Sequence, residues 1–235
     1  FEAIKEDLDA LPFPYHVVPG NMDIGNKRTE VAGPTRDDPS LSVTEEGIRQ
    51  FESVFGPLWW SFEYKEVRFS GFCDILVDSL LPQEEDLWRW LETQAQRPRS
   101  HHHVWLMHHA LFIDDPYEPN FDITDPDHYK DWYFGIDDPG RGRLLQVFKD
   151  TQAEIVLSGH IHCRKAQTAE GIRFYKGPST GFSQWGDRWK DGDDTLGFQR
   201  FDVSDEGIAC TFIPLDQVSD AEGYGPGGHP RPKGQ

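Results

Sequence analysis

The stretch of sequence that decides the fold reads Glu-Ile-Val-Leu-Ser-Gly-His-Ile-His and spans residues 154–162. Its first half, Glu154–Leu157, is a short apolar run of the kind that forms a buried strand. His160 and His162 follow directly, in a turn. Two histidines separated by one residue cannot share one face of a helix, but in a turn beyond a strand they can point into a common cavity. Because neutral imidazole is a good ligand for zinc, manganese and iron, the stretch predicts either a metal site or two hydrogen-bonding histidines.

Two other segments show the same arrangement of an apolar run followed by polar side chains. The pair His108-His109 follows a predicted strand at residues 103–107, and Gly-Asn-Met-Asp at residues 20–23 follows an apolar run at residues 13–18. Taken singly, the first indicates one core histidine beside an exposed neighbour, and the second indicates an ordinary turn. Three such strand ends in one chain predict a common site, because open α/β sheets bind ligands at the carboxyl ends of their strands.

The rest of the chain alternates helices and strands as far as residue 157 and then contains strands only. Helices are expected over residues 2–10, 44–55, 84–96 and 143–151, and strands over 13–18, 59–64, 66–72, 74–78, 103–107, 154–157, 172–176, 197–203 and 208–214. Residues 114–140 are expected to form a long loop. This pattern predicts an α/β fold, a mixed β-sandwich flanked by helices. The expected core residues are Trp59, Trp60, Phe62, Leu87, Trp90, Leu91, Leu145 and Phe148.

Composition narrows the class of protein further. One domain is expected over residues 1–218, followed by a disordered Gly- and Pro-rich tail at residues 219–235. The net charge of −18 argues against a protein that coats nucleic acid, because such proteins need clustered Lys and Arg. No run approaches the length of a membrane span. The 3 cysteines, an odd and sparse set, argue against a disulfide framework and favour a cytoplasmic location.

In their order along the chain, the three polar segments resemble motifs of the calcineurin-like metallophosphoesterases. That family carries Asp-x-His, Gly-Asp, Gly-Asn-His-Asp/Glu, a His ahead of a His-Pro-like pair, and Gly-His-x-His. The last three motifs match residues 20–23, 108–110 and 159–162, and the resemblance covers residues 13–215. It implies the α/β/β/α metallophosphoesterase fold and a metal-dependent phosphoric ester hydrolase, either a phosphatase or a phosphodiesterase.

The resemblance also implies roles for individual residues. Asn21, His108 and His160 would hold one of two divalent metal ions (Mn, Fe, Zn or Mg), and His162 would hold the other. Asp23 would be the catalytic residue that orients its neighbour. The ions would activate a hydroxide for in-line attack on a phosphate ester, carried by a small phosphorylated substrate or a phosphoprotein.

The chain departs from the family pattern in two ways. The Asp-x-His and Gly-Asp motifs are missing from a chain that begins at Phe1, so the domain is expected to be incomplete at its N-terminus. Acidic residues that could replace their ligands are expected to be solvated loop carboxylates, namely Asp74, Asp78, Asp114 and Asp115. Met22 stands where the family has a histidine, and a thioether cannot protonate a leaving group. These departures keep an alternative open, a non-catalytic metal-binding or interaction remnant of the same fold.

Overall fold

The computed structural model describes residues 1–30, 39–183, 189 and 191–218, and within them two β-sheets and the helices around them. The strands are β1 (Trp59–Tyr64), β2 (Val67–Phe72), β3 (His102–Leu106), β4 (Ile155–Ser158), β5 (Lys165–Ala169), β6 (Ile172–Lys176), β7 (Gly197–Ser204) and β8 (Gly207–Pro214). The helices are α1 (Glu2–Asp9), α2 (Asn21–Ile24), α3 (Glu45–Phe55), α4 (Pro82–Ala95), α5 (Tyr129–Phe134) and α6 (Gly140–Asp150), with short 3₁₀ turns η1 (Pro39–Leu41) and η2 (Asp74–Leu76).

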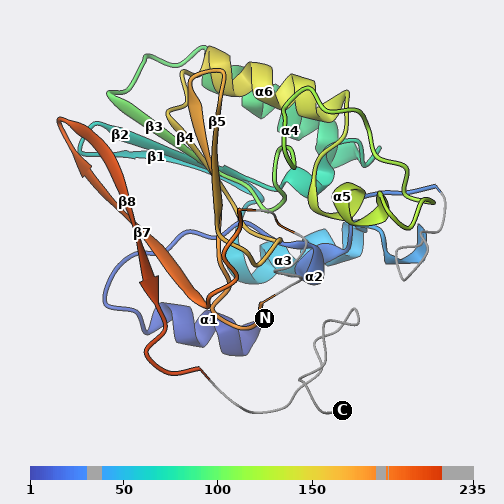
Figure 1. The fold of residues 1–235 in the computed structure, drawn as a ribbon, viewed down its shortest axis with the longest axis horizontal. Coiled ribbons are helices and arrows are strands. Elements are labelled where there is room, and N and C mark those ends of the chain that lie inside the picture. Colours follow the sequence, from blue (N-terminus) through green and yellow to red (C-terminus); the bar gives the residue numbers. More distant parts are fainter. Residues whose placement is uncertain (31–38, 184–188, 190, 219–235) are drawn as a thin grey trace.

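The larger sheet is mixed and has the strand order β1-β2-β3-β4-β6-β5 (Figure 1). Its four inner strands β2, β3, β4 and β6 are parallel, and the edge strands β1 and β5 are antiparallel to their neighbours. The carboxyl ends of the parallel strands therefore all lie at the same end of the sheet. Leu106 pairs with Leu157 there, so the turns that follow β3 and β4 leave the sheet side by side.

The two faces of this sheet are covered by different elements. On one face, helices α4 and α6 pack side by side and bury the main core, to which Trp105 and Phe148 contribute. On the other face, the hairpin β7-β8 buries Ile208 against Val104 and Ile155. Side chains alternate across a strand, so Val104 and Trp105 face opposite layers. The predicted class, a mixed sandwich flanked by helices, is confirmed, and its second sheet has two strands in the described part of the chain.

Most predicted elements are found within a few residues of their expected positions, but two predicted strands are wrong. Residues 13–18 join no sheet, because Pro12 and Pro14 have no N–H to donate to a ladder, and Phe13 is 60% exposed. Residues 74–78 begin with the 3₁₀ turn η2 instead of a strand. Strand β5 was not expected, and the predicted loop at residues 114–140 contains helix α5.

The expected core is confirmed for four of its five helical residues. Leu87, Leu91, Leu145 and Phe148 are buried, whereas the aromatic residues Trp59, Trp60, Phe62 and Trp90 are only partly buried. Trp60 and Phe62 lie against the ring of His16 instead of facing the helices. The predicted tail at residues 219–235 lies outside the described residues. Among the described helices, none combines the length and the apolar character that crossing a bilayer requires.

Candidate metal centre

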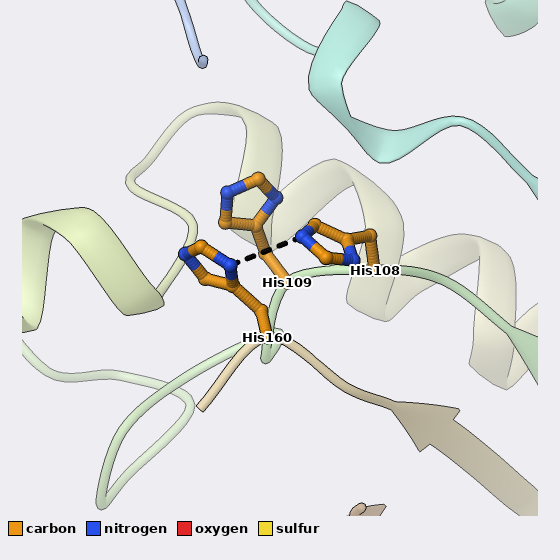
Figure 2. A group of neighbouring side chains, drawn as sticks. All are labelled: His108, His109 and His160. Carbon is orange, nitrogen blue, oxygen red and sulfur yellow. Dashed lines mark hydrogen bonds between the residues drawn. The ribbon is translucent and has the colours of Figure 1, made fainter. Parts of the chain in front are cut away.

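Three histidine side chains meet at the edge where the parallel strands end. His108 and His109 follow β3, and His160 follows β4. One ring nitrogen of each lies within 4.8 Å of those of the other two, and Figure 2 shows the three rings gathered together. His109 and His160 are buried, and His108 is half-buried. The meeting point follows from topology, because the turns after β3 and β4 are neighbours.

The side chain of Asn21, at the start of α2, joins two of these rings. His108 Nε2 lies 3.0 Å from Asn21 Oδ1 and 3.0 Å from His160 Nδ1. The amide nitrogen of Asn21 donates to Asn26 Oδ1 and to the Tyr133 hydroxyl oxygen, which leaves its Oδ1 directed at the imidazole. The structure thus brings together three of the five residues for which the resemblance implies a role.

The donor atoms of these three side chains suit a divalent cation. His160 Nε2 lies 3.1 Å from the Tyr133 carbonyl oxygen, so it carries the ring hydrogen and leaves a lone pair on Nδ1. A hydrogen on His108 Nε2 is then shared between two acceptors, Asn21 Oδ1 and His160 Nδ1. A cation that replaces this hydrogen gains one amide oxygen and two imidazole nitrogens as ligands.

Burial keeps the imidazoles in the neutral form that binds metal. Desolvation lowers the pKa of His108 to about 3, and the neighbouring His109 adds to the effect. Desolvation also lowers the pKa of His160 far below its usual value, again with contributions from the adjacent rings. A metal ion and a proton compete for the same lone pair of an imidazole. Because these rings are neutral at neutral pH, a cation can bind there without displacing protons from charged imidazoles.

Asp74 is a buried residue of this site, although a solvated carboxylate is expected at this position from the sequence. Its side chain accepts hydrogen bonds from the backbone N–H of His108 (2.5 Å), the backbone N–H of His109 (3.1 Å) and the ring Nδ1–H of His109 (2.7 Å). Burial opposes its negative charge, but His109 and these donors outweigh the burial and lower the pKa of Asp74. The expectation was wrong because η2 turns Asp74 inward; the other three aspartates, Asp78, Asp114 and Asp115, are exposed as expected.

His162 and Asp23 lie near the cluster without joining it. His162 lines the same pocket as His108 and His160, a cavity of about 510 Å³ whose other walls include residues 177–180 and part of β7. Asp23 accepts a hydrogen bond from the Gly20 N–H at 2.8 Å and so fixes the turn that presents Asn21. Desolvation raises the pKa of the Asp23 carboxyl, and this hydrogen bond opposes the rise.

The chain is similar in sequence to known proteins over most of its length. No protein-family profile matches the chain. It is 27% identical over 225 residues to serine/threonine-protein phosphatase CPPED1 of Danio rerio, in an alignment covering 93% of this chain and 64% of that protein. It is 24% identical over 229 residues to the Homo sapiens protein of the same name, covering 93% and 62%. The chain thus spans less than two thirds of the length of these relatives, whose similarity confirms the resemblance drawn from the three motifs.

Among solved structures, the fold is similar to that of purple acid phosphatase PPD1 from Lupinus luteus seeds. The two chains are 17% identical with a TM-score of 0.49, and the alignment covers 88% of this chain and 40% of that one.

Proposed function

We propose that this chain, a relative of the calcineurin-like metallophosphoesterases, hydrolyses phosphoric esters at the pocket formed by the turns after β3 and β4. The observation that carries the proposal is the meeting of Asn21 Oδ1 and His160 Nδ1 at 3.0 Å from His108 Nε2. His108 and His160 line an open pocket of about 510 Å³, which is large enough for a phosphorylated group. The relatives named serine/threonine-protein phosphatase support the reaction class.

In this proposal the chain's own residues bind and orient. A bound divalent cation would act as a Lewis acid on a phosphoryl oxygen and supply a nucleophile from water near neutral pH. Asn21, His108 and His160 hold that cation. His162, on the wall of the same pocket, is the proposed ligand for a second cation. Asp23 acts through the Gly20 N–H by fixing the orientation of Asn21. The proposed substrate is a small phosphorylated molecule or a phosphoprotein.

Met22 favours a second candidate function, a metal-binding domain without catalysis. The residue is 54% exposed next to Asn21 and offers no proton to a leaving group. A centre that binds metal but cannot assist departure of the alcohol fits this alternative. Substrates with good leaving groups separate the two functions, because their hydrolysis does not require that proton.

The test is hydrolysis of p-nitrophenyl phosphate and bis(p-nitrophenyl) phosphate by the chain loaded with Zn²⁺ or Mn²⁺. His160→Ala is compared with His128→Ala, which removes an exposed imidazole from helix α5's N-terminal flank. We expect turnover that a chelator abolishes, that His160→Ala lowers by at least about 10²-fold, and that His128→Ala leaves unchanged. Metal binding without turnover would support the non-catalytic alternative, and turnover that survives both chelator and His160→Ala would contradict both functions.

A further inference from the structure

We infer that His109 is a third imidazole ligand of this metal centre, oriented by Asp74, and that the centre therefore prefers a zinc-class cation to Mg²⁺ or Mn²⁺. The family resemblance gives a ligand role to His108 and His160, but none to His109. The inference builds on the metal site of the proposed function and adds a ligand and a selectivity to it.

The tautomer of His109 is the first support. Its Nδ1 lies 2.7 Å from Asp74 Oδ2, and both side chains are almost completely buried, with 2% and 0% of their surfaces exposed. A carboxylate only accepts hydrogen bonds, so His109 Nδ1 carries the hydrogen and Nε2 keeps the lone pair. Metal-ligating histidines commonly donate their second nitrogen to a carboxylate in this way, which fixes the ring and raises its basicity.

The position of the ring is the second support. The His109 ring centroid lies 4.4 Å from that of His160 and 5.0 Å from that of His108. A ring nitrogen of each of the three lies within 4.8 Å of the others, a spacing that one cation can bridge. In Figure 2 the His109 ring lies beside the dashed line that joins the other two rings. The pair His108-His109 therefore contributes both of its rings, because the chain turns sharply after β3 and is no longer extended.

The charge of Asp74 is the third support. Among the described residues, its one ion-pair partner is His109, whose ring carries a positive charge only when it is protonated. A buried carboxylate without a cationic partner is costly even when it is fully hydrogen-bonded. A divalent cation held by His109 would supply that positive charge through the imidazole, and this favours a ligand over a purely structural histidine.

The donor set then predicts the metal. Three imidazole nitrogens and the Asn21 amide oxygen are four neutral donors, which suits a tetrahedral Zn²⁺ site. Mg²⁺ and Mn²⁺ prefer sites rich in carboxylate and water oxygens. Among the described residues, the group of candidate ligands contains these three histidines and no carboxylate, because Asp74 is hydrogen-bonded to the Nδ1 of His109.

The decisive measurement on the unaltered chain is X-ray absorption of the Zn²⁺-loaded protein, which counts imidazole ligands. We expect three. In parallel, calorimetry gives the Kd for Zn²⁺, Mn²⁺ and Mg²⁺, and we expect Zn²⁺ to bind at least about 10²-fold more tightly than Mg²⁺. Two variants address His109: His109→Gln removes the ring, and Asp74→Asn keeps the shape of the orienting group but removes its charge. Each should raise the Kd for Zn²⁺ by about 10–100-fold. His128→Gln is the matched control and should leave it unchanged.

Two imidazoles in the absorption spectrum, or an unchanged Kd in a folded His109→Gln variant, would overturn the inference. If either variant fails to fold by circular dichroism, the count on the unaltered chain decides. The proposed function fails separately: a centre with three imidazoles that hydrolyses no phosphate ester leaves the inference standing. An active enzyme whose metal has only two imidazole ligands would support the proposed function and overturn the inference.

Discussion

Met22 is the side chain at which this chain departs most clearly from the family that it resembles. It lies in α2 between Asn21, a proposed metal ligand, and Asp23, and it is 54% exposed. A thioether accepts hydrogen bonds weakly and donates none. Any hydrolysis at this centre must therefore proceed without a proton donor at this position, and esters of acidic alcohols should be the better substrates.

Replacing Met22 by His tests this argument. We predict that Met22→His raises kcat for an alkyl phosphate by about 10²–10⁴-fold, the usual contribution of general acid–base catalysis. The gain for p-nitrophenyl phosphate should be smaller, because its leaving group needs less protonation. Steady-state kinetics on both substrates measure the difference, and Met22→Leu is the control of similar size that lacks a proton. Equal rates in all three proteins would contradict this account of Met22, and the absence of turnover in all three would favour the non-catalytic alternative.

Lys176 is a second residue whose surroundings change its chemistry. It is 2% exposed at the end of β6, donates to the Ile113 carbonyl oxygen at 2.7 Å and to Gln167 Oε1, and lies 5.0 Å from the Phe112 ring. Burial lowers its pKa to about 7, with the nearby Lys165 adding to the shift. In the unfolded chain a lysine titrates at about 10.4. Between these values the unfolded state binds more protons, so stability rises with pH.

We therefore predict that the free energy of unfolding rises from pH 7 to about 10, with a contribution from Lys176 of at most roughly 1.4 kcal/mol per pH unit. Below pH 7 Lys176 is charged in both states and contributes no slope. Lys176→Met should remove this component, whereas Lys65→Met, at an exposed lysine, should keep it. Urea unfolding at pH 7, 8 and 9 gives the slopes, and parallel curves for the unaltered protein and Lys176→Met would refute the prediction.

At the scale of elements, the turn before α2 sets how closely two segments approach. Gly20 caps this helix, and a Cβ at Gly20 would lie 2.7 Å from His108 Cε1 and 2.9 Å from His108 Nδ1. These separations are shorter than van der Waals contact. The absence of a side chain at Gly20 is thus what lets the His108 ring reach Asn21, although the backbone of Gly20 itself is extended and open to any residue.

We predict that Gly20→Ala displaces the His108 ring and weakens Zn²⁺ binding by about 10-fold or more, the range seen when a supporting contact of a metal ligand is lost. Gly159→Ala is the matched control, because its Cβ would meet only the His108 carbonyl oxygen at 3.9 Å. Calorimetric titration with Zn²⁺ compares the two variants. Loss of affinity in Gly159→Ala but not in Gly20→Ala would contradict this account of the turn.

The same elements show what sequence reasoning can reach. Strands β3 and β4 were predicted, because apolar runs bounded by turn residues are typical of buried parallel strands. The proximity of His108 and His160 followed from these two strands. The buried contacts of Asp74 were not predicted, because they depend on η2. This 3₁₀ turn directs the carboxylate toward backbone N–H groups of the turn after β3, and sequence periodicity gives no signal for such a long-range contact. The strand predicted at residues 13–18 was wrong because Pro14, and Pro12 just before the run, cannot donate hydrogen bonds to a neighbouring strand.

At the scale of the whole molecule, the hairpin β7-β8 links the second layer of the sandwich to the pocket. Ile208 of β8 packs on Val104 and Ile155 of the large sheet. Farther along the hairpin, Phe198 and Phe201 of β7 line the pocket that also holds His108 and His160. The packing of the hairpin β7-β8 on the large sheet therefore affects both the stability of the sandwich and the shape of the pocket. The proposed metal ligands belong to other elements.

This separation yields a prediction for Ile208→Ala. Removing the buried side chain should lower the free energy of unfolding by about 2–5 kcal/mol, the usual cost of such a truncation. Val203→Ala, on the same hairpin but 39% exposed, should cost no more than about 0.5 kcal/mol. Urea unfolding measures both. Because the loosened hairpin forms a wall of the pocket and holds no metal, Ile208→Ala should raise KM for p-nitrophenyl phosphate and leave the Kd for Zn²⁺ unchanged. A Zn²⁺ affinity that falls together with stability would show that the layer also holds the metal centre in place.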